Sequence, residues 1–169
     1  MTSRTIYGGG KDLEIVIVKG TMEHLVACTE ALIHSEIGAA YFPSAQKAEA
    51  FLQQGLTKEE IFVAIDDHGD CVGYIWFTLE GAFYRFPYLL NIAVKKDLRG
   101  RGIGKKLLAL FEKKGFAKAS KLFLLVSDFN AGAKRLYQAI GYKEVGVIPD
   151  LIKAGVAEHI MMKSKGQLR

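Results

Sequence analysis

Alternating and continuous runs of hydrophobic residues, separated by turn-forming residues, predict seven β-strands. The first run, LEIVIVK, alternates apolar and polar positions and is rich in β-branched side chains. The second and third runs flank the turn sequence DDHGD at residues 66–70, which predicts an antiparallel hairpin. The seven strands are expected at residues 13–19, 61–66, 72–79, 88–94, 122–126, 143–148 and 158–163.

Helical periodicity and capping residues predict about four helices between these strands. The longest is expected to end near Ala119, because Ile103, Leu107, Leu110 and Phe111 recur at helical spacing and form one apolar stripe. The other helices are expected at residues 21–35, 45–54 and 131–140, each preceded by a capping residue or followed by glycine.

The order of these elements excludes a regular alternation of strand and helix. Three strands follow one another at residues 61–94 without a helix between them, and two more do so at residues 143–163, which argues against a doubly wound parallel sheet. We expect an α/β (α+β) domain with a mixed, mostly antiparallel central sheet of about seven strands flanked by about four helices. With 169 residues and no linker-like stretch, the chain is expected to form one domain over residues 1–169. Residues 1–12 are expected to be a loose N-terminal extension.

Composition narrows the class of protein. Half of the residues are hydrophobic and 24% are charged, which is typical of a folded domain with a core. No apolar run reaches the roughly 18 to 20 residues of a membrane-spanning helix, and the N-terminus lacks the pattern of a signal peptide. Cys28 and Cys71 have no CxxC spacing. We therefore expect a cytoplasmic protein that has no disulfide framework, binds no metal and does not associate with a membrane.

The two halves of the chain carry opposite net charge. Residues 1–90 have 6 basic and 12 acidic residues, whereas residues 91–169 have 17 basic and 6 acidic residues. A basic half suits nucleic acid, a membrane surface or a phosphorylated cofactor, and an acidic half suits a cationic substrate. Solvated surfaces would give the same asymmetry, so charge alone does not choose among these.

A glycine-rich turn between the strand at 88–94 and the longest helix is the most informative segment. Gly100, Gly102 and Gly104 leave backbone N–H groups accessible at a helix N-terminus, where hydrogen bonds and the helix dipole favour an anion. Basic residues around these glycines suit a pyrophosphate. The spacing fits neither the P-loop nor the GxGxxG dinucleotide fingerprint, but it does fit [RQ]xxGxG, beginning at Arg99.

Two segments carry a resemblance to a known family. These are NIAVKKDLRGRGIGKKLL at residues 91–108 and NAGAKRLYQAIGY at residues 130–142. Here the chain resembles the GNAT superfamily of acetyl-CoA-dependent N-acetyltransferases, and within it, loosely, the branch that acetylates protein N-termini. The resemblance implies the acyl-CoA N-acyltransferase fold, and acetyl-CoA as the co-substrate without a metal.

The resemblance also assigns the cofactor site. It implies that the strand before the turn pairs with the pantetheine arm, that the turn holds the pyrophosphate and that Asn130 reaches the pantetheine. The alternative is that Asn130 is only a helix cap. The implied cofactor-binding residues are Ile92, Ala93, Val94, Arg99, Gly100, Arg101, Gly102, Ile103, Gly104, Lys105, Asn130, Ala133 and Lys134.

The resemblance nominates Tyr137 as the general acid that protonates the departing thiolate. A phenol with a pKa near ~10 keeps its proton at neutral pH and can donate it. The alternative is that Tyr137 only packs on the apolar face of its helix beside Leu136 and Ile140.

The general base is less well defined. The two positions at which relatives in the superfamily carry a base hold no carboxylate here; one of them is Leu125. Glu80 and Asp128 remain candidates, either through a water molecule or by binding a cationic substrate, and both residues also suit ordinary solvated loops. Glu36, His34 and His159 are weaker candidates.

The acceptor is expected to be a small-molecule or peptide amine. Residues 36–50 and 80–86 fall where this superfamily builds its acceptor pocket, and both segments are rich in aromatic residues. A peptide N-terminus, a polyamine and an amino sugar stay open as acceptors. A non-catalytic acetyl-CoA sensor and a nucleic-acid-binding protein are the rival functions, although no pattern typical of a nucleic-acid-binding surface appears. The chain is expected to be a monomer or a homodimer.

Overall fold

The computed structural model describes residues 13–166, and the expected extension at residues 1–12 lies outside them. Seven strands and five α-helices make up the described part of the chain, so the seven expected strands are confirmed. The strands are β1 (Val16–Lys19), β2 (Ile61–Ile65), β3 (Cys71–Ala82), β4 (Phe86–Val94), β5 (Lys121–Ser127), β6 (Lys143–Pro149) and β7 (Ala157–Ser164). The helices are α1 (Leu25–Ile33), α2 (Glu36–Tyr41), α3 (Ala45–Thr57), α4 (Ile103–Lys118) and α5 (Ala131–Ala139).

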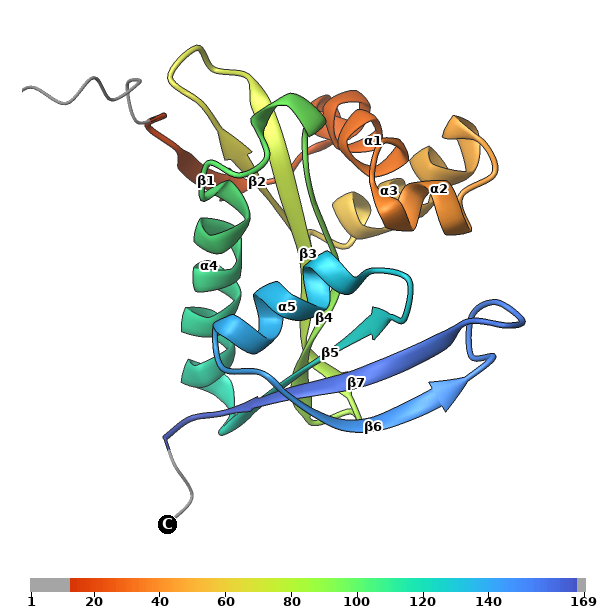
Figure 1. The fold of residues 1–169 in the computed structure, drawn as a ribbon. Coiled ribbons are helices and arrows are strands. Elements are labelled where there is room, and N and C mark those ends of the chain that lie inside the picture. The colour runs from red at the N-terminus through yellow and green to blue at the C-terminus, as the bar shows by residue number, and fades with distance from the viewer. Residues whose placement is uncertain (1–12, 167–169) are drawn as a thin grey trace, which may run out of the picture.

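All seven strands form one sheet in the order β1-β2-β3-β4-β5-β7-β6 (Figure 1). Each neighbouring pair is antiparallel except β4 and β5, which run parallel. The sheet is therefore mixed and mostly antiparallel, as predicted. The parallel pair is short, because only Tyr88–Phe123 and Leu89–Leu124 are paired across it.

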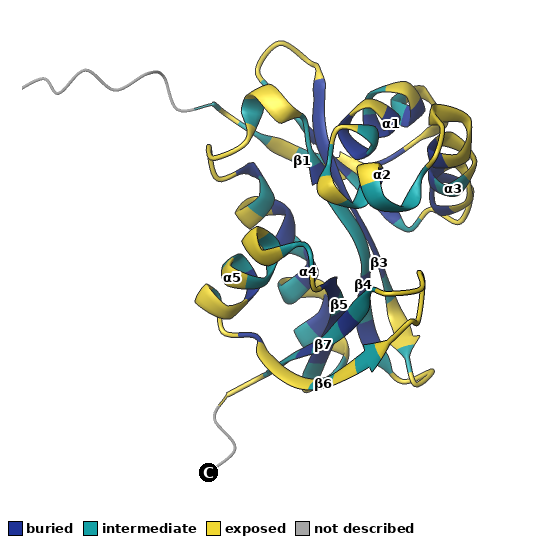
Figure 2. Ribbon diagram, turned by 45° about the vertical axis from the view of Figure 1, so that its right-hand side comes forward, coloured by how far each residue is buried: buried dark blue, intermediate teal, exposed yellow. Residues whose placement is uncertain are grey.

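Helices cover both faces of the sheet and create two hydrophobic cores (Figure 2). One core lies under α4 and α5 and contains Leu107 and Phe111, which are fully buried. The other lies under α1 and α3 and contains Leu32, Leu52 and Trp76 of β3. The longest buried strand, β3, contributes to both cores, because its successive side chains point to opposite faces of the sheet.

The region after β1 differs from the prediction. In place of one helix over residues 21–35, a short 3₁₀ turn (Met22–His24) leads into α1, and a separate helix, α2, follows. Six residues are too few for helical periodicity to show in the sequence. Ser35 caps α2 by accepting a hydrogen bond from the Gly38 N–H at 3.0 Å. A Cβ on Gly38 would lie 1.9 Å from the Leu32 carbonyl oxygen, so glycine allows α2 to pack against the end of α1.

Two further observations concern the described residues. No helix among residues 13–166 has both the length and the hydropathy needed to span a membrane. Within the same residues, no group of three or more His, Cys, Asp or Glu side chains is placed to hold a metal ion.

Candidate active site

The end of the β4–β5 ladder creates the main opening in the fold. Beyond Leu89 and Leu124 the two strands separate, although β4 continues to Val94 and β5 to Ser127. Antiparallel β3 pairs with the other edge of β4 as far as Val94. Within the described residues, the backbone edge of β4 that faces β5 therefore has no strand partner beyond Leu89, and its N–H and C=O groups are available to a ligand.

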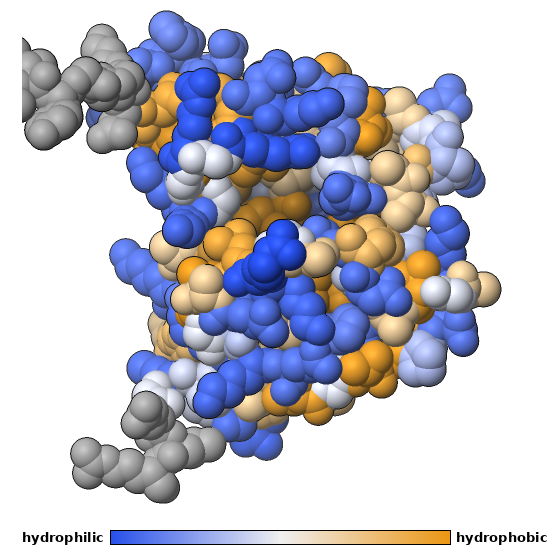
Figure 3. Space-filling view, in the orientation of Figure 1, coloured by the Kyte–Doolittle hydropathy of each residue, from blue (hydrophilic) through white to orange (hydrophobic). Residues whose placement is uncertain are grey.

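Two cavities meet in this opening and form one continuous cleft. A cavity of about 450 Å³ lies between β4, the glycine turn and α5, and we call it the turn cavity. A second, of about 310 Å³, lies between β4, β5 and α2, and we call it the strand cavity. Figure 3 shows a hollow with a hydrophobic floor across this face of the molecule. The residues that line both cavities are Ile37, Ile92, Asn130, Ala133 and Tyr137.

The glycine turn forms the anion-binding end of the turn cavity. Gly102 is the N-cap of α4 and has a φ of 81°, a left-handed conformation that favours glycine. The first helical hydrogen bond runs from the Lys106 N–H to the Gly102 carbonyl at 3.1 Å. The backbone N–H groups of Ile103, Gly104 and Lys105 therefore lack helical acceptors. A Cβ on Gly104 would meet only a Val94 methyl at 4.0 Å, so the space beside these N–H groups is open.

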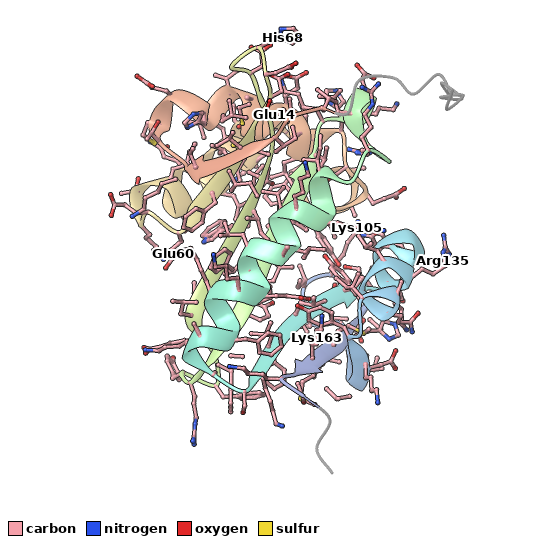
Figure 4. The ribbon with its side chains drawn as sticks, turned by 90° about the vertical axis from the view of Figure 1, so that its left-hand side faces the viewer. Glu14, Glu60, His68, Lys105, Arg135 and Lys163 are labelled. Carbon is pink, nitrogen blue, oxygen red and sulfur yellow. The ribbon has the colours of Figure 1, made fainter. Side chains whose placement is uncertain are left out.

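Two basic side chains that line the turn cavity have different roles in the structure. The Arg99 guanidinium donates to the Val94 carbonyl at 3.0 Å and to the His34 carbonyl at 2.9 Å, so it ties the glycine turn to the end of α1. Lys105, at the N-terminal end of α4 (Figure 4), makes no ion pair within residues 13–166. Its ammonium group is available to an anion bound at the turn.

Eleven of the thirteen residues predicted to bind the cofactor line the turn cavity, and Arg101 and Lys134 do not. Arg101 is exposed in the turn. The Lys134 ammonium pairs with Glu144 and lies 3.0 Å from His159 Nδ1, on the side of α5 that faces β6 and β7. Lys134, followed by His159, holds the pKa of Glu144 below its usual range. Lys134 is therefore committed to an ion pair outside the cleft.

Tyr137 stands where the two cavities join. It is 6% exposed, and burial raises the pKa of its phenol well above the ordinary value. Its ring packs edge-on against Tyr142 with centroids 5.9 Å apart. Among the described residues, its hydroxyl makes no hydrogen bond. Tyr137 thus combines core packing with a protonated hydroxyl that borders the cleft.

Asn130 likewise serves the fold and borders the cleft. It is the N-cap of α5, where its side-chain oxygen accepts a hydrogen bond from the Ala133 N–H at 3.4 Å. Because the oxygen faces the helix, the side-chain NH₂ group is left for a ligand in the cleft. The capping explanation and the binding explanation are compatible in this geometry.

Two substitutions separate these roles. Asn130→Asp is expected to keep the helix cap and the stability, because aspartate caps as well as asparagine, but to weaken binding of an anionic ligand. Asn130→Ala is expected to lose about 1 kcal/mol of stability together with ligand affinity. Urea unfolding and calorimetric titration with coenzyme A measure the two effects. Equal affinity in the wild type and Asn130→Asp would show that Asn130 is a cap alone.

A buried carboxylate that the sequence did not single out lies at the far end of the strand cavity. Glu158 of β7 is 2% exposed, and the β5–β7 register places it opposite Ser127. Its Oε1 atom accepts hydrogen bonds from the Ser127 hydroxyl at 2.7 Å and from the Tyr41 hydroxyl at 2.5 Å. The three residues come from β7, β5 and α2, so only the tertiary fold brings them together.

The carboxylates predicted as candidate bases lie elsewhere. Glu80, at the far end of β3, pairs with Lys118 at 3.0 Å and lines neither cavity. Asp128 also lines neither cavity, and its Oδ2 accepts a hydrogen bond from the Ala157 N–H at 3.2 Å. Their catalytic roles stay predictions, and the geometry favours Glu158 over both.

Of the two aromatic segments predicted for the acceptor pocket, one contributes to the strand cavity and the other lies elsewhere. Tyr41 and Phe42 line the strand cavity. Phe83 and Phe86, at the β3–β4 hairpin, instead pack against Phe123 with centroids 5.6 and 5.5 Å away. Phe83 and Phe86 therefore line neither cavity, and the place of that hairpin in an acceptor pocket stays a prediction.

Tyr41 and Tyr88 of the strand cavity contribute to a sensitivity of stability to alkaline pH. Burial, followed by the hydrogen bond to Glu158, raises the pKa of Tyr41 to about 12, and burial, followed by the Glu158 charge, raises that of Tyr88 to about 12. An unfolded tyrosine titrates near ~10. The stabilisation is complete below pH ~10, and it is lost between pH ~10 and 12, where only the unfolded chain releases its protons.

The free energy of unfolding should therefore fall over that interval, as urea titrations at pH 9 to 12 would show. Tyr88→Phe is expected to decline less steeply than the wild type. An identical decline in the variant would assign the effect to other groups.

Comparison with known proteins settles the family. The model of the acetyltransferase (GNAT) family matches residues 28–142, a span that includes the glycine turn, Asn130 and Tyr137. The chain belongs to the GNAT family. The family model begins in α1 and ends just after α5. Glu158 lies outside the matched span, in the part of the chain that follows it.

Relatives of this GNAT chain include acetyltransferases named for different amines. An N-alpha-acetyltransferase of Sulfurisphaera tokodaii is 31% identical over 114 residues, covering 61% of this chain and 68% of the relative. A thialysine N-epsilon-acetyltransferase of Bos taurus is 34% identical over 84 residues, covering 47% and 49%. The first matched relatives, from Mycobacterium leprae, Methanocaldococcus jannaschii and Bacillus subtilis, are longer than the aligned region. The chain spans 33%, 66% and 55% of their respective lengths.

Solved structures share the fold, among them a GNAT-family acetyltransferase from Bacillus cereus ATCC 10987 with a TM-score of 0.73 at 16% identity, covering 91% of this chain and 99% of that one. Ard1 from Thermoplasma volcanium superimposes with a TM-score of 0.74 at 17% identity, covering 90% of this chain and 99% of that one. A protein from Pyrococcus horikoshii OT3 gives a TM-score of 0.75 at 24% identity, covering 91% and 100%. At these identities the likeness concerns the fold alone, and it confirms the acyl-CoA N-acyltransferase fold.

Proposed function

We propose that this protein is an N-acetyltransferase that transfers the acetyl group of acetyl-CoA to a primary amine by direct attack in a ternary complex. The observation that carries the proposal is the position of Tyr137, which lines both the turn cavity and the strand cavity. One cavity offers an anion site and the other a buried carboxylate. A phenol at their junction is placed for chemistry between an anionic donor and a cationic acceptor.

The turn cavity fits coenzyme A. Unpaired N–H groups at the start of α4, together with Arg99 and Lys105, suit the pyrophosphate. The free edge of β4 over residues 90–94 suits the amide groups of the pantetheine arm, which can pair with it as a strand would. The thioester would then lie near Tyr137.

The strand cavity would hold the acceptor amine at Glu158. The carboxylate takes a proton from the ammonium group, and the neutral amine then attacks the carbonyl carbon of the thioester. The carbon–sulfur bond breaks as the amide bond forms. Tyr137 gives its proton to the departing sulfur and is reprotonated by the second proton of the nitrogen, and Glu158 releases its proton to solvent. The products are the N-acetylated amine, coenzyme A as a thiol, and one proton.

The test is to titrate the protein with acetyl-CoA by calorimetry and to follow thiol release with a panel of peptides, polyamines, amino sugars and alkylamines. Turnover with an amine class, with the acetylated product seen by mass spectrometry, is the expected result. Tight acetyl-CoA binding without turnover of any amine would indicate a non-catalytic sensor. Absence of acetyl-CoA binding would overturn the proposal.

A further inference from the structure

Among residues 13–166, Glu158 is a buried carboxylate without a cationic partner. Both of its hydrogen-bond donors, Tyr41 and Ser127, are neutral hydroxyls, and both donate to Oε1. Within residues 13–166, Oε2 accepts no hydrogen bond, and no lysine, arginine or histidine forms an ion pair with Glu158. Buried charges in proteins are ordinarily paired, because an isolated one is costly. The strand cavity that Glu158 lines therefore lacks one positive charge.

The rest of the strand cavity supplies no further charge. Apart from Glu158, no acidic or basic side chain among the described residues lines it. A ligand with a second ammonium group would find no second carboxylate there, and a ligand with a carboxylate or phosphate would find no cation. Apolar side chains dominate the remaining walls: Ile37, Phe42, Phe51, Leu90 and Ile152.

These apolar walls are fixed by the core behind them. The Phe42 and Phe51 rings lie 5.0 Å apart, and Phe51 packs on Trp76 with centroids 4.8 Å apart. Trp76 is in turn held by a hydrogen bond from its Nε1 to Glu60 at 2.8 Å. The aromatic wall is therefore formed before a ligand binds, which favours a rigid apolar group over a flexible polar chain.

We propose that the acceptor is a primary amine with a single positive charge on an apolar body, bound with its ammonium on Oε2 of Glu158. This specificity rests on the proposed acetyl transfer. Two sources share the chemistry: a peptide whose first residue is large and apolar, and a free arylalkylamine. Polyamines, aminoglycosides and free amino acids each carry charges that the cavity leaves unpaired, so they are poor acceptors.

The first experiment compares kcat/KM for thiol release among phenethylamine, peptides beginning with Met-Leu or Asp-Asp, spermidine, an aminoglycoside and free lysine. Phenethylamine or the Met-Leu peptide should exceed every multiply charged amine by about 100-fold or more. A preference between these two identifies the source. Faster turnover of spermidine, the aminoglycoside or lysine would overturn the inference while leaving acetyl transfer intact. Turnover of none of these amines would contradict the proposed function itself.

A substitution that places a negative charge at the opening of the strand cavity tests the same inference by changing the protein instead of the amine. Ile152 lines the strand cavity and is 57% exposed, whereas its neighbour Leu151 is 48% exposed and lines neither cavity. Ile152→Asp should lower kcat/KM for phenethylamine about tenfold and raise the relative rate with spermidine. Leu151→Asp, with the same charge change, should leave both unchanged. Equal effects of the two variants would contradict the assignment.

Removing the charge of Glu158 completes the test. Glu158→Gln keeps an oxygen that can accept from Tyr41 and Ser127, but it cannot neutralise an ammonium group. The KM for the preferred amine should rise by about 100-fold, kcat should fall because glutamine cannot take the proton from the amine, and the affinity for coenzyme A should stay unchanged. An unaltered amine KM would show that the ammonium binds elsewhere.

Discussion

Tyr137→Phe is expected to lower kcat by about 100- to 10,000-fold while leaving the KM for acetyl-CoA nearly unchanged. That range is typical for loss of a positioned general acid. Phenylalanine keeps the ring that packs against Tyr142 and removes only the hydroxyl that borders the cleft. Because that hydroxyl has no hydrogen-bond partner among residues 13–166, its loss should cost little stability. Steady-state kinetics and a urea titration measure both quantities.

Tyr142→Phe provides the matched control for this experiment. Tyr142 is the neighbouring buried tyrosine, and its hydroxyl lines neither cavity. Removing that hydroxyl should leave kcat unchanged. A kcat for Tyr137→Phe within threefold of the wild type would exclude Tyr137 as the acid. Equal losses in both variants would indicate a packing effect.

Gly104→Glu is expected to abolish coenzyme A binding without harming the fold. The new carboxylate would occupy the open space beside the unpaired N–H groups, where the pyrophosphate is proposed to bind. Two unit charges 4 Å apart near a protein surface repel by about 4 kcal/mol, which corresponds to a loss of affinity of about 1000-fold. The same charge in the first turn of α4 favours the helix, so the thermal midpoint should not fall.

Gly104→Ala is the control at the same position. It adds a methyl group without charge and should raise stability by up to about 1 kcal/mol, since glycine is a poor helix former. Most of the affinity for coenzyme A should remain. Calorimetric titration and thermal unfolding of the two variants give the comparison. Undiminished binding by Gly104→Glu would place the pyrophosphate elsewhere.

Local sequence patterns predicted most of the fold because most of its elements are locally encoded. The stripe at Ile103, Leu107 and Phe111 is buried in the core under α4, as its spacing requires. The [RQ]xxGxG spacing located the turn because backbone conformation at Gly102 depends on the residue itself. Helix α2 escaped prediction because six residues contain too little periodicity, and its position depends on contact with α1.

The acceptor end of the site could not be predicted for a related reason. Glu158 meets Ser127 through strand register and Tyr41 through the position of α2, and these contacts span 31 and 117 residues. No local sequence motif encodes contacts between residues so far apart in the chain. In sequence, Glu158 is a single acidic residue at the start of a strand. Glu80 and Asp128 were equally plausible there, and only the packing of the sheet distinguishes the three.

The short β4–β5 ladder also makes the stability of the protein depend on a ligand bound beside it. Two residue pairs join one half of the sheet to the other, so a ligand that pairs with the free edge of β4 acts as a substitute strand across the seam. Such a ligand binds the folded chain and not the unfolded one. At 100 times its Kd it would add about 2.7 kcal/mol to the free energy of unfolding. Coenzyme A, the ligand proposed for this edge, would then slow proteolysis of the protein, whether or not it carries an acetyl group.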